Sequence, residues 1–266
     1  MRITDFSYGE NSKKLSDFGF VVCRFDSKGI DTVSNGAVVS FNSVPVNNGA
    51  KHEMISSTYD DCLECTIQIC KNPCISDDME IDQTTYRELT KWLCRRKFLK
   101  FKPISDEYLD LYHEAIINVS RVELDGKFVG LELKIRTNRP FSLIEPKIID
   151  INNIEQDGKH FIDDTSHEEG YIYPHVEITV NADGNLNIHN AIEDRNTYIA
   201  NCKSGEVITM DYPVISSSDS SHNIQNDFNW NFFRVANAFE KNRNDLTISI
   251  PCSIKVEYSP VVKVGF

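Results

Sequence analysis

Complete catalytic and cofactor-binding motifs are missing from this sequence of 266 residues. It contains no G-x-S-x-G nucleophile elbow, no P-loop and no G-x-G-x-x-G dinucleotide fingerprint. The segment His167-Glu168-Glu169-Gly170-Tyr171 begins like the helical zinc motif H-E-x-x-H, but Tyr171 stands where the second histidine is required. We therefore predict no catalytic residue, no cofactor and no metal, and expect a protein that is not an enzyme.

The sequence also lacks long apolar runs and an excess of positive charge. No stretch of about 18 or more apolar residues could span a bilayer, and the first ten residues contain no apolar core of a signal peptide. We therefore expect a chain that folds in the cytosol, without a membrane partner. Its 28 Lys and Arg against 40 Asp and Glu give a net charge of −12, which argues against a nucleic-acid partner because phosphate binding requires clustered cations.

Three acidic residues are spaced like the first ligands of a calcium loop: Asp78, Glu80 and Asp82. The pattern then fails, because Gln83 replaces the required glycine and Leu89 replaces the closing glutamate. An acidic first turn of a helix explains these residues better, since negative charge is favoured at a helix N-terminus. The cationic cluster Arg95-Arg96-Lys97 fits the end of the same helix.

Four of the eight cysteines lie close together in the sequence: Cys62, Cys65, Cys70 and Cys74. The first two have the C-x-x-C spacing of a zinc knuckle, but on an extended strand residues an odd number apart point to opposite faces. Leu63, Cys65, Ile67 and Ile69 instead form one apolar row on such a strand. We predict that all eight cysteines are reduced, metal-free and packed as small apolar side chains.

Seven histidines are scattered along the chain: His52, His113, His160, His167, His175, His189 and His222. The sequence does not show whether any of them meets a carboxylate. The residues that would bind a ligand are therefore left unknown.

Short alternating segments indicate a mainly β protein. In the last of them, Thr247 to Tyr258, apolar side chains occupy one parity and mostly polar ones the other, which is typical of an antiparallel strand with one buried face. Earlier strands are predicted over 18–25, 37–44, 62–70, 112–122 and 127–137. The last two flank Asp125-Gly126, the strongest hairpin signal in the sequence.

One α-helix interrupts these strands, over about 83–94. Asp82 is the expected N-cap, and the predicted apolar stripe contains Tyr86, Leu89, Leu93 and a candidate fourth member, Cys94, with Trp92 near its edge.

A domain boundary is predicted after Phe141, which gives domains of residues 1–141 and 142–266. Residues 142–153 lose the alternation and follow Pro140, so they are expected to be a connector. A second set of short strands follows, with turns at Asp183-Gly184 and Ser204-Gly205. Such spacing indicates a sandwich or barrel, and the serine-rich segment 216–221 is expected to be a flexible loop.

The order of these features resembles the distal tail protein (Dit) family of long-tailed bacteriophages. Four places carry the resemblance: the opening from Ile3 to Gly19, the helix ending in Tyr86–Leu93 followed by Phe98–Phe101, the hairpin that closes at Thr137–Phe141, and Tyr173–Val180 with Asn226–Arg234 and the terminal strand. Each motif alone is weak, and their order along nearly the whole chain carries the assignment. The glycine usual between the aromatic segment and the last strand is absent, and residues 239–245 stand in its place.

The resemblance implies an N-terminal ring-forming β domain with one helix and a C-terminal galectin-like β-sandwich. It further implies a structural virion protein, made in the bacterial host cytoplasm, that forms a homohexameric hub at the distal end of a phage or prophage-derived tail. The implied partners are other copies of the chain, the tail tube protein, a tail-associated hub or tip protein and, as a further candidate, a receptor-binding protein. The family brings no catalytic residues with it.

Two other functions are weighed against a tail hub: a carbohydrate-binding lectin that contributes to host adsorption, and a β-rich hydrolase with a dispersed site. A lectin would expose aromatic rings beside polar groups, and a hydrolase would have a pocket with paired titratable groups. In the segment from Phe228 to Phe233, alternation places Phe228, Trp230 and Phe232 on one face. We therefore expect Trp230 to be buried in the core and the C-terminal domain to have no saccharide site of its own.

Overall fold

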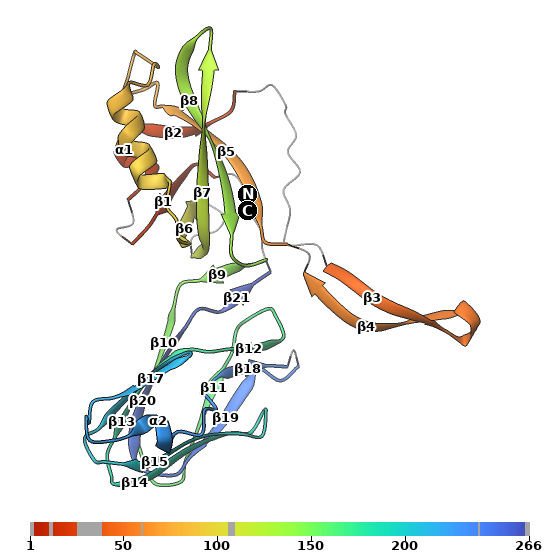
Figure 1. The fold of residues 1–266 in the computed structure, drawn as a ribbon, viewed down its shortest axis with the longest axis vertical. Helices are drawn as coiled ribbons and strands as arrows, with labels where there is room; N and C mark the ends of the chain where they lie inside the picture. The colour runs from red at the N-terminus through yellow and green to blue at the C-terminus, as the bar shows by residue number, and fades with distance from the viewer. Residues whose placement is uncertain are drawn as a thin grey trace. The chain divides into compact units, whose positions relative to one another are not determined.

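The computed structural model describes residues 3–10, 13–25, 39–59, 61–105, 110–238 and 240–263. They divide into two compact units, Met1–Leu143 with Lys263–Phe266, and Ile144–Val262. Strands make up most of each unit, as the sequence predicts (Figure 1). Among the described residues, the helices fall short of the length and apolarity that a membrane-spanning helix needs.

The N-terminal unit is built on an antiparallel sheet in which one face carries the helix (Figure 1). Its strands, in spatial order, are β1 (Asp5–Tyr8), β6 (Leu99–Ile104), β7 (Leu111–Leu124), β8 (Lys127–Thr137), β5 (Glu64–Lys71) and β2 (Phe20–Cys23). The 3₁₀ turn η1 (Leu15–Phe18) precedes β2, so the strand predicted over 18–25 is shorter than expected.

The predicted hairpin joins β7 to β8. Asp125 and Gly126 have φ values of 51° and 73°, the two positive values that a tight type I′ turn requires. On β8 the apolar residues Leu131, Leu133 and Ile135 are all buried, which confirms the predicted alternation.

Helix α1 (Gln83–Leu93) begins at the predicted cap. The Asp82 carboxylate accepts hydrogen bonds from the backbone N–H groups of Thr84 (2.8 Å) and Thr85 (3.0 Å). The buried residues of the helix are Leu89, Trp92 and Leu93. The prediction is therefore wrong in two details: Trp92 belongs to the core, and the candidate stripe residue Cys94 is exposed.

Trp92 is the aromatic centre of the N-terminal core and is only 8% exposed. Its ring stacks on Phe18 at 4.7 Å between ring centroids and on Phe6 at 5.7 Å. The indole N–H donates a 3.0 Å hydrogen bond to the backbone carbonyl of Tyr8. The indole thus fastens the helix to β1 by both packing and a satisfied buried donor.

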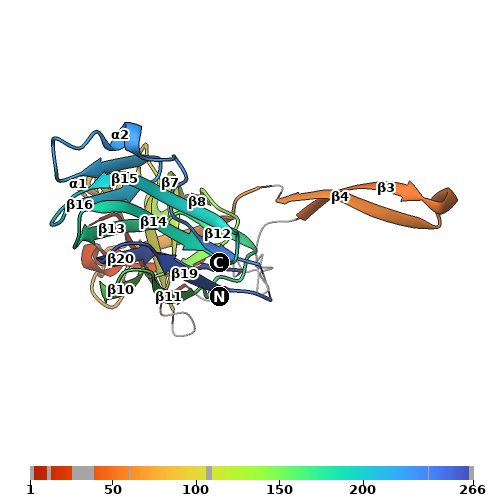
Figure 2. The same ribbon diagram turned by 90° about the horizontal axis from the view of Figure 1, so that it is seen from below.

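A separate two-stranded hairpin consists of β3 (Val39–Val46) and β4 (Lys51–Tyr59), joined by the 3₁₀ turn η2 (Asn47–Gly49). Among the described strands, β3 and β4 pair only with one another (Figures 1 and 2). Of the strand predicted over 37–44, residues 37 and 38 lie outside the described residues. The Tyr59 ring packs edge to face on Phe141 at 4.7 Å, at the base of the hairpin.

The C-terminal unit is a sandwich of two antiparallel sheets, as expected. One sheet has the spatial order β10 (Lys147–Ile154), β20 (Cys252–Tyr258), β13 (His175–Val180), β16 (Val207–Asp211) and β17 (Val214–Ser217). The other has the order β11 (Gly158–Asp163), β19 (Arg243–Ile248), β14 (Gly184–Asn190) and β15 (Arg195–Cys202). A single apolar cluster is shared by both sheets.

The terminal segment predicted as one strand is two strands. β19 ends at Ile248 and β20 begins at Cys252, and the two belong to opposite sheets of the sandwich. Ile248, Cys252, Ile254 and Val256 are nevertheless all buried. The alternation survives because the core lies between the sheets, so a chain that crosses from one sheet to the other keeps the same side chains inward.

Two expectations about irregular segments are wrong. The connector predicted over 142–153 contains β9 (Ser142–Ile144) and most of β10, whose exposed and polar residues hide its alternation. In the serine-rich segment, Ser216 and Ser217 belong to β17. The remaining elements are β12 (Gly170–Ile172), β18 (Val235–Asn237), β21 (Val261–Val262) and the short helix α2 (Ile224–Asp227), which lies beside β15 (Figure 2).

The position of Trp92 predicts a large cost of truncation. Trp92→Ala should lower the free energy of unfolding by about 3–5 kcal/mol, because it removes a buried ring and leaves a cavity. Thermal and denaturant unfolding of the purified protein would measure this. Glu88→Ala, on the exposed side of the same helix, should change it by only about 0.5 kcal/mol, and equal effects of the two variants would contradict the packing described.

Candidate functional site

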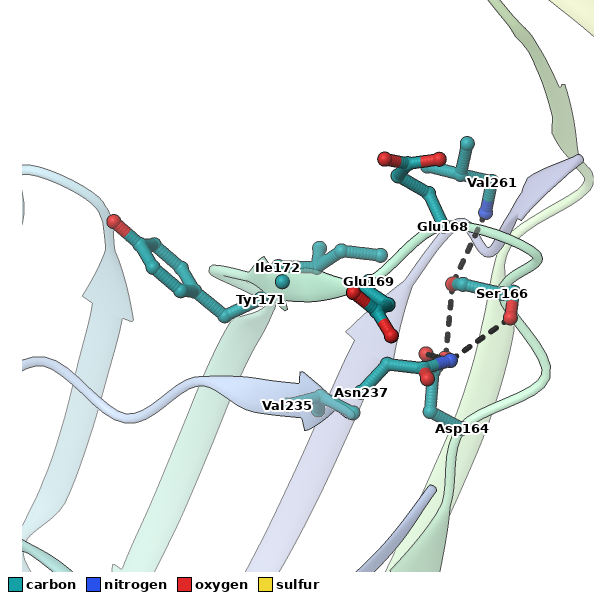
Figure 3. A pocket seen from close by; sticks show the side chains of 10 residues that line it. Asp164, Ser166, Glu168, Glu169, Tyr171, Ile172, Val235, Asn237 and Val261 are labelled. Carbon is teal, nitrogen blue, oxygen red and sulfur yellow. Dashed lines mark hydrogen bonds between the residues drawn. The ribbon is translucent and has the colours of Figure 1, made fainter. Parts of the chain in front are cut away.

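A small pocket lies where β12 pairs with β18 in the C-terminal unit (Figure 3). The Asn237 amide donates hydrogen bonds to the buried Asp164 carboxylate (2.9 Å) and to the Ser166 carbonyl (2.8 Å). The Ser166 hydroxyl donates to Asp164 at 3.0 Å. In Figure 3 the ring of Tyr171 points away from this network. Asp164 is thus held as a structural acceptor that ties the segment before β12 to β18.

The pocket is too small for an organic substrate. Its volume is about 60 Å³, whereas ligand pockets usually have about 300–1,000 Å³. A second hollow of about 370 Å³ is open and lined by the charged segment 240–245 with Ala191 and Ile192. There Arg243 pairs with Asp245 at 2.8 Å in an exposed ion pair. The small pocket is lined by three carboxylate residues, Asp164, Glu168 and Glu169, but leaves no room for a substrate beside them. The larger hollow is open to solvent, so neither space matches the enclosed site that the hydrolase hypothesis requires.

An aromatic row begins at this pocket and crosses the C-terminal unit. We use this name for Tyr171, Tyr173, Tyr212, Phe232 and Trp230. Successive ring centroids lie 5.4, 4.1, 5.3 and 6.4 Å apart, and the rings of Tyr173 and Tyr212 are nearly parallel, at 6°. The members come from β12 and the residue that follows it, from the turn between β16 and β17, and from the segment between α2 and β18, so no local spacing in the sequence could have revealed the row.

Trp230 is exposed, contrary to the sequence prediction. Phe228 and Phe232 are buried as expected, at 3% and 4% exposure, but Trp230 is 56% exposed. Its φ of 58° lies in the left-handed region, which is rare for a bulky side chain. Alternation of faces requires extended backbone at every residue, and this one conformation turns the indole out to solvent.

Asn229 holds this turn in place. Its side-chain oxygen accepts from the backbone N–H of Asn231 (3.0 Å) and of Tyr198 on β15 (3.2 Å). Its amide donates to the Asn196 carbonyl at 3.0 Å. An asparagine that bonds the backbone two residues ahead is a common turn device, and here it also fixes the turn to the neighbouring sheet.

At one end of the aromatic row, Arg234 stacks on Tyr171, with its guanidinium carbon 3.9 Å from the ring centroid. The same guanidinium donates two hydrogen bonds to Glu193, at 2.8 and 2.5 Å. This bidentate geometry is strong and directional, so the cation that touches the row is already neutralised.

A buried charged cluster was invisible in the sequence. Nδ1 of His222 lies 2.5 Å from the Glu206 carboxylate, and Nε2 lies 3.3 Å from that of Asp227. The side chains of Glu206 and His222 are almost fully buried. Ser217 donates to the same Glu206 oxygen that faces His222, at 2.5 Å.

This cluster resembles catalytic chemistry only in composition. A nucleophilic serine must bond to the histidine that takes its proton, whereas Ser217 bonds to the carboxylate. Burial raises the pKa of Glu206, but the hydrogen bonds from Ser217 and the Lys203 N–H, with His222, outweigh it and hold the pKa below the ordinary 4.5. The cluster therefore ties α2 and its preceding turn to β16 and β17.

The prediction that all eight cysteines are packed is wrong for Cys74 and Cys94, which are exposed. Cys70, Cys202 and Cys252 are buried, and Cys65 packs on the N-terminal core. Burial raises the pKa of Cys65 and Cys252 to about 12 and that of Cys202 to about 11, which disfavours the thiolate that metals and electrophiles require. Within the described ranges, no three His, Cys, Asp or Glu side chains are grouped to hold a metal. That all eight are reduced and metal-free remains a prediction.

The other sequence candidates are dispersed. The segment 167–171 runs into strand β12 and so cannot present a helical zinc motif. Asp82 caps α1, in agreement with its predicted role. His113 is buried near Ser142, with its Nε2 3.3 Å from the hydroxyl, and burial lowers its pKa to about 4. The structure brings none of these residues together.

The hairpin formed by β3 and β4 exposes apolar side chains on its own. Phe41, Met54 and Ile55 are 65%, 61% and 67% exposed, and Val39 and Val44 are also exposed. Lys51 and Glu53 pair with one another at 2.6 Å. The hairpin thus exposes apolar side chains, and its lysine and glutamate form an ion pair with each other.

Comparisons with known proteins cover both units. A family model described as a phage tail protein N-terminal domain matches residues 1–139, and one described as a phage tail C-terminal domain matches residues 141–258. The crystal structure of the SPP1 Dit (gp 19.1) protein is similar in fold, with a TM-score of 0.64 at 9% identity. The similarity covers 97% of this chain and 99% of that one, which is described as a paradigm of hub adsorption apparatus in phages that infect Gram-positive bacteria. No curated protein matches the sequence.

The exposure of Trp230 predicts a small effect on stability. Trp230→Ala should change the free energy of unfolding by about 0.5 kcal/mol, as for other surface substitutions. Phe232→Ala, two residues away and buried, should cost about 3–5 kcal/mol. Denaturant unfolding would compare the two, and a large loss in Trp230→Ala would show that the indole packs in the core after all.

The depressed pKa of Glu206 predicts loss of stability in acid. Because the unfolded chain binds this proton more readily than the folded chain, the free energy of unfolding should fall as the pH drops below about 4.5. Glu206→Gln should flatten that dependence, while Ser217→Ala, which removes a bond to the charged form, should move it to higher pH. Thermal melts between pH 3 and 7 would measure all three proteins, and the same acid slope in Glu206→Gln would contradict the assignment.

Proposed function

Because the chain belongs to the phage tail protein family matched by both domain models, we propose that it is the ring-forming subunit of a tail hub. In this proposal six copies form a ring at the distal end of the tail. The ring joins the tail tube protein to a tail-associated hub or tip protein, and a receptor-binding protein is a further partner. The protein has no enzymatic role.

The exposed hairpin is the observation that supports a ring. An isolated two-stranded hairpin is marginally stable in water, and within the part of the chain that the structure describes, β3 and β4 pair only with each other. Clustered exposed apolar side chains usually mark a protein interface. A surface that binds a different surface of the next copy makes a head-to-tail contact, and such contacts form a ring when the rotation between copies closes.

Charge favours another copy of the chain as the occupant. The subunit carries a net charge of −12, so association of copies through general surface would be opposed by repulsion. The described hairpin contains Lys51 and Glu53, which neutralise each other, and its contacts would be apolar. The hairpin therefore contributes no net charge from this pair to the repulsion between acidic subunits.

The fold similarity supports a structural role. The protein of similar fold is described as a hub, and its likeness extends over nearly the whole of both chains. The pocket at β12 is a small space lined by groups that bond to one another. A structural subunit needs rigid sheets and surfaces that bind other proteins, rather than a ligand pocket.

Substitutions in the hairpin would test the ring. Phe41→Asp combined with Ile55→Asp should leave the protein monomeric, because charge would replace the apolar contact. The matched control is Ile148→Asp combined with Phe161→Asp, two exposed apolar residues of the C-terminal unit, and this variant should assemble like wild type. Light scattering at high concentration and negative-stain microscopy would give the particle mass and shape.

Two results would overturn the proposal. One is a wild-type protein that stays monomeric at high concentration and is absent from tail particles. The other is a hairpin variant that assembles as well as the control. Because a ring can need the tail tube as a template, the measurement should be repeated with the tail tube protein present before a monomer is accepted.

A further inference from the structure

We propose that Trp230 and Tyr212 form a platform that binds a short neutral saccharide on the C-terminal unit. The inference does not rest on ring formation. It follows from the exposure, rigidity and charge of the aromatic row, and it replaces the expectation that this unit has no saccharide site.

The backbone conformation holds the exposed rings of the row toward solvent. Trp230, Tyr212 and Tyr171 are each a little more than half exposed, while Phe232 is buried between Trp230 and Tyr212. The indole reaches solvent only through a left-handed backbone conformation. Such conformations are unfavourable for bulky residues and are concentrated at functional sites.

The platform is rigid before any ligand arrives. Tyr212 stacks face to face on Tyr173 at 4.1 Å, and Asn229 fixes the turn that carries Trp230 with three hydrogen bonds. Tyr and Trp have few rotatable bonds, so little conformational entropy is lost when they bind. A preorganised pair of flat rings suits the flat C–H faces of pyranose rings.

Two polar groups are available for hydroxyl recognition, the indole N–H of the platform itself and the side-chain amide of the next residue in the chain. In the part of the chain that the structure describes, the indole N–H of Trp230 and the side-chain amide of Asn231 have no hydrogen-bond partner. An indole N–H is a donor, and an amide both donates and accepts. Sugar hydroxyls can form hydrogen bonds with both groups, whereas an aliphatic protein surface could not.

Charge and size favour a neutral saccharide over a protein. Arg234, the cation that stacks on the row, is already paired bidentately with Glu193, so no free cation of the row is available for an anionic ligand. Three half-exposed aromatic residues offer roughly 300 Å², well below the about 800 Å² per partner of a standard protein interface. That area matches a ligand of two or three sugar rings.

Glycan binding by the full chain would test the platform. The probes are an array of neutral oligosaccharides of β-linked glucose, galactose and N-acetylglucosamine, and a titration of intrinsic fluorescence with the retained oligomer. The chain has two tryptophans, of which Trp92 is buried and Trp230 exposed, so a shift of the solvent-exposed emission reports on the platform directly. We expect wild type to be retained, and Trp230→Ala and Tyr212→Ala to bind at least tenfold more weakly.

Matched controls separate binding from folding and from assembly. Phe161→Ala removes an exposed aromatic ring from β11, at the opposite edge of the same sheet from β15, and should bind like wild type. Trp230→Phe should retain part of the affinity, and thermal melts should show each variant folded. The Phe41→Asp, Ile55→Asp protein should still bind the glycan, so failure of the ring would not be mistaken for failure of the platform.

Three outcomes would overturn the inference. Wild type could be retained by none of the neutral oligosaccharides, Trp230→Ala could bind as tightly as wild type, or Phe161→Ala could lose binding equally. A Trp230→Ala protein that loses binding to another purified tail protein, without glycan binding by wild type, would assign the row to a protein interface instead.

Discussion

Each strand of the two large sheets in the C-terminal unit has to bury one of its two faces against the opposite sheet, and the other features of that unit depend on this constraint. Ile178, Ile188 and Ile248 are almost completely buried from strands of both sheets, and burial of such side chains is the main favourable contribution to folding. Once these faces are fixed, the turns and edges between strands are free to carry polar networks. The Glu206–His222 cluster, the Asp164–Asn237 network and the Asn229 turn all occupy such positions.

Those polar networks have a shared role: each fastens an irregular segment to a sheet. A buried polar group is costly unless its hydrogen bonds are made, so Glu206 and Asp164 persist because several donors converge on them. The Asn229 turn goes further and determines what the surface presents. It holds Trp230 outward between two buried phenylalanines. An aromatic segment whose other two rings pack in the core therefore exposes one ring to solvent. The C-terminal unit thereby combines a rigid interior with a shaped surface.

The two units use apolar exposure in different ways. In the N-terminal unit the exposed apolar side chains lie mainly on the β3–β4 hairpin, which pairs with none of the other described strands. The aromatic row in the C-terminal unit instead carries flat, fixed rings. Flexible apolar surface suits burial by another large surface, and rigid rings suit a small ligand with a flat face. The proposed ring contact and the proposed saccharide platform thus lie on separate units of the chain.

The sequence by itself determined the mainly β class, the capped helix at Asp82, the Asp125-Gly126 hairpin and the inward parity of the terminal segment, because each depends on neighbours within a few residues. The order of these features also led to the distal tail family, and the fold similarity to a Dit hub protein confirms that resemblance at the level of fold. Tertiary structure decided the rest. The break between β19 and β20 leaves the alternation of buried residues unchanged, so parity could not reveal that the two strands lie in opposite sheets. The exposure of Trp230 and the meeting of Glu206 with His222 depend on contacts between segments distant in sequence, which local patterns do not encode.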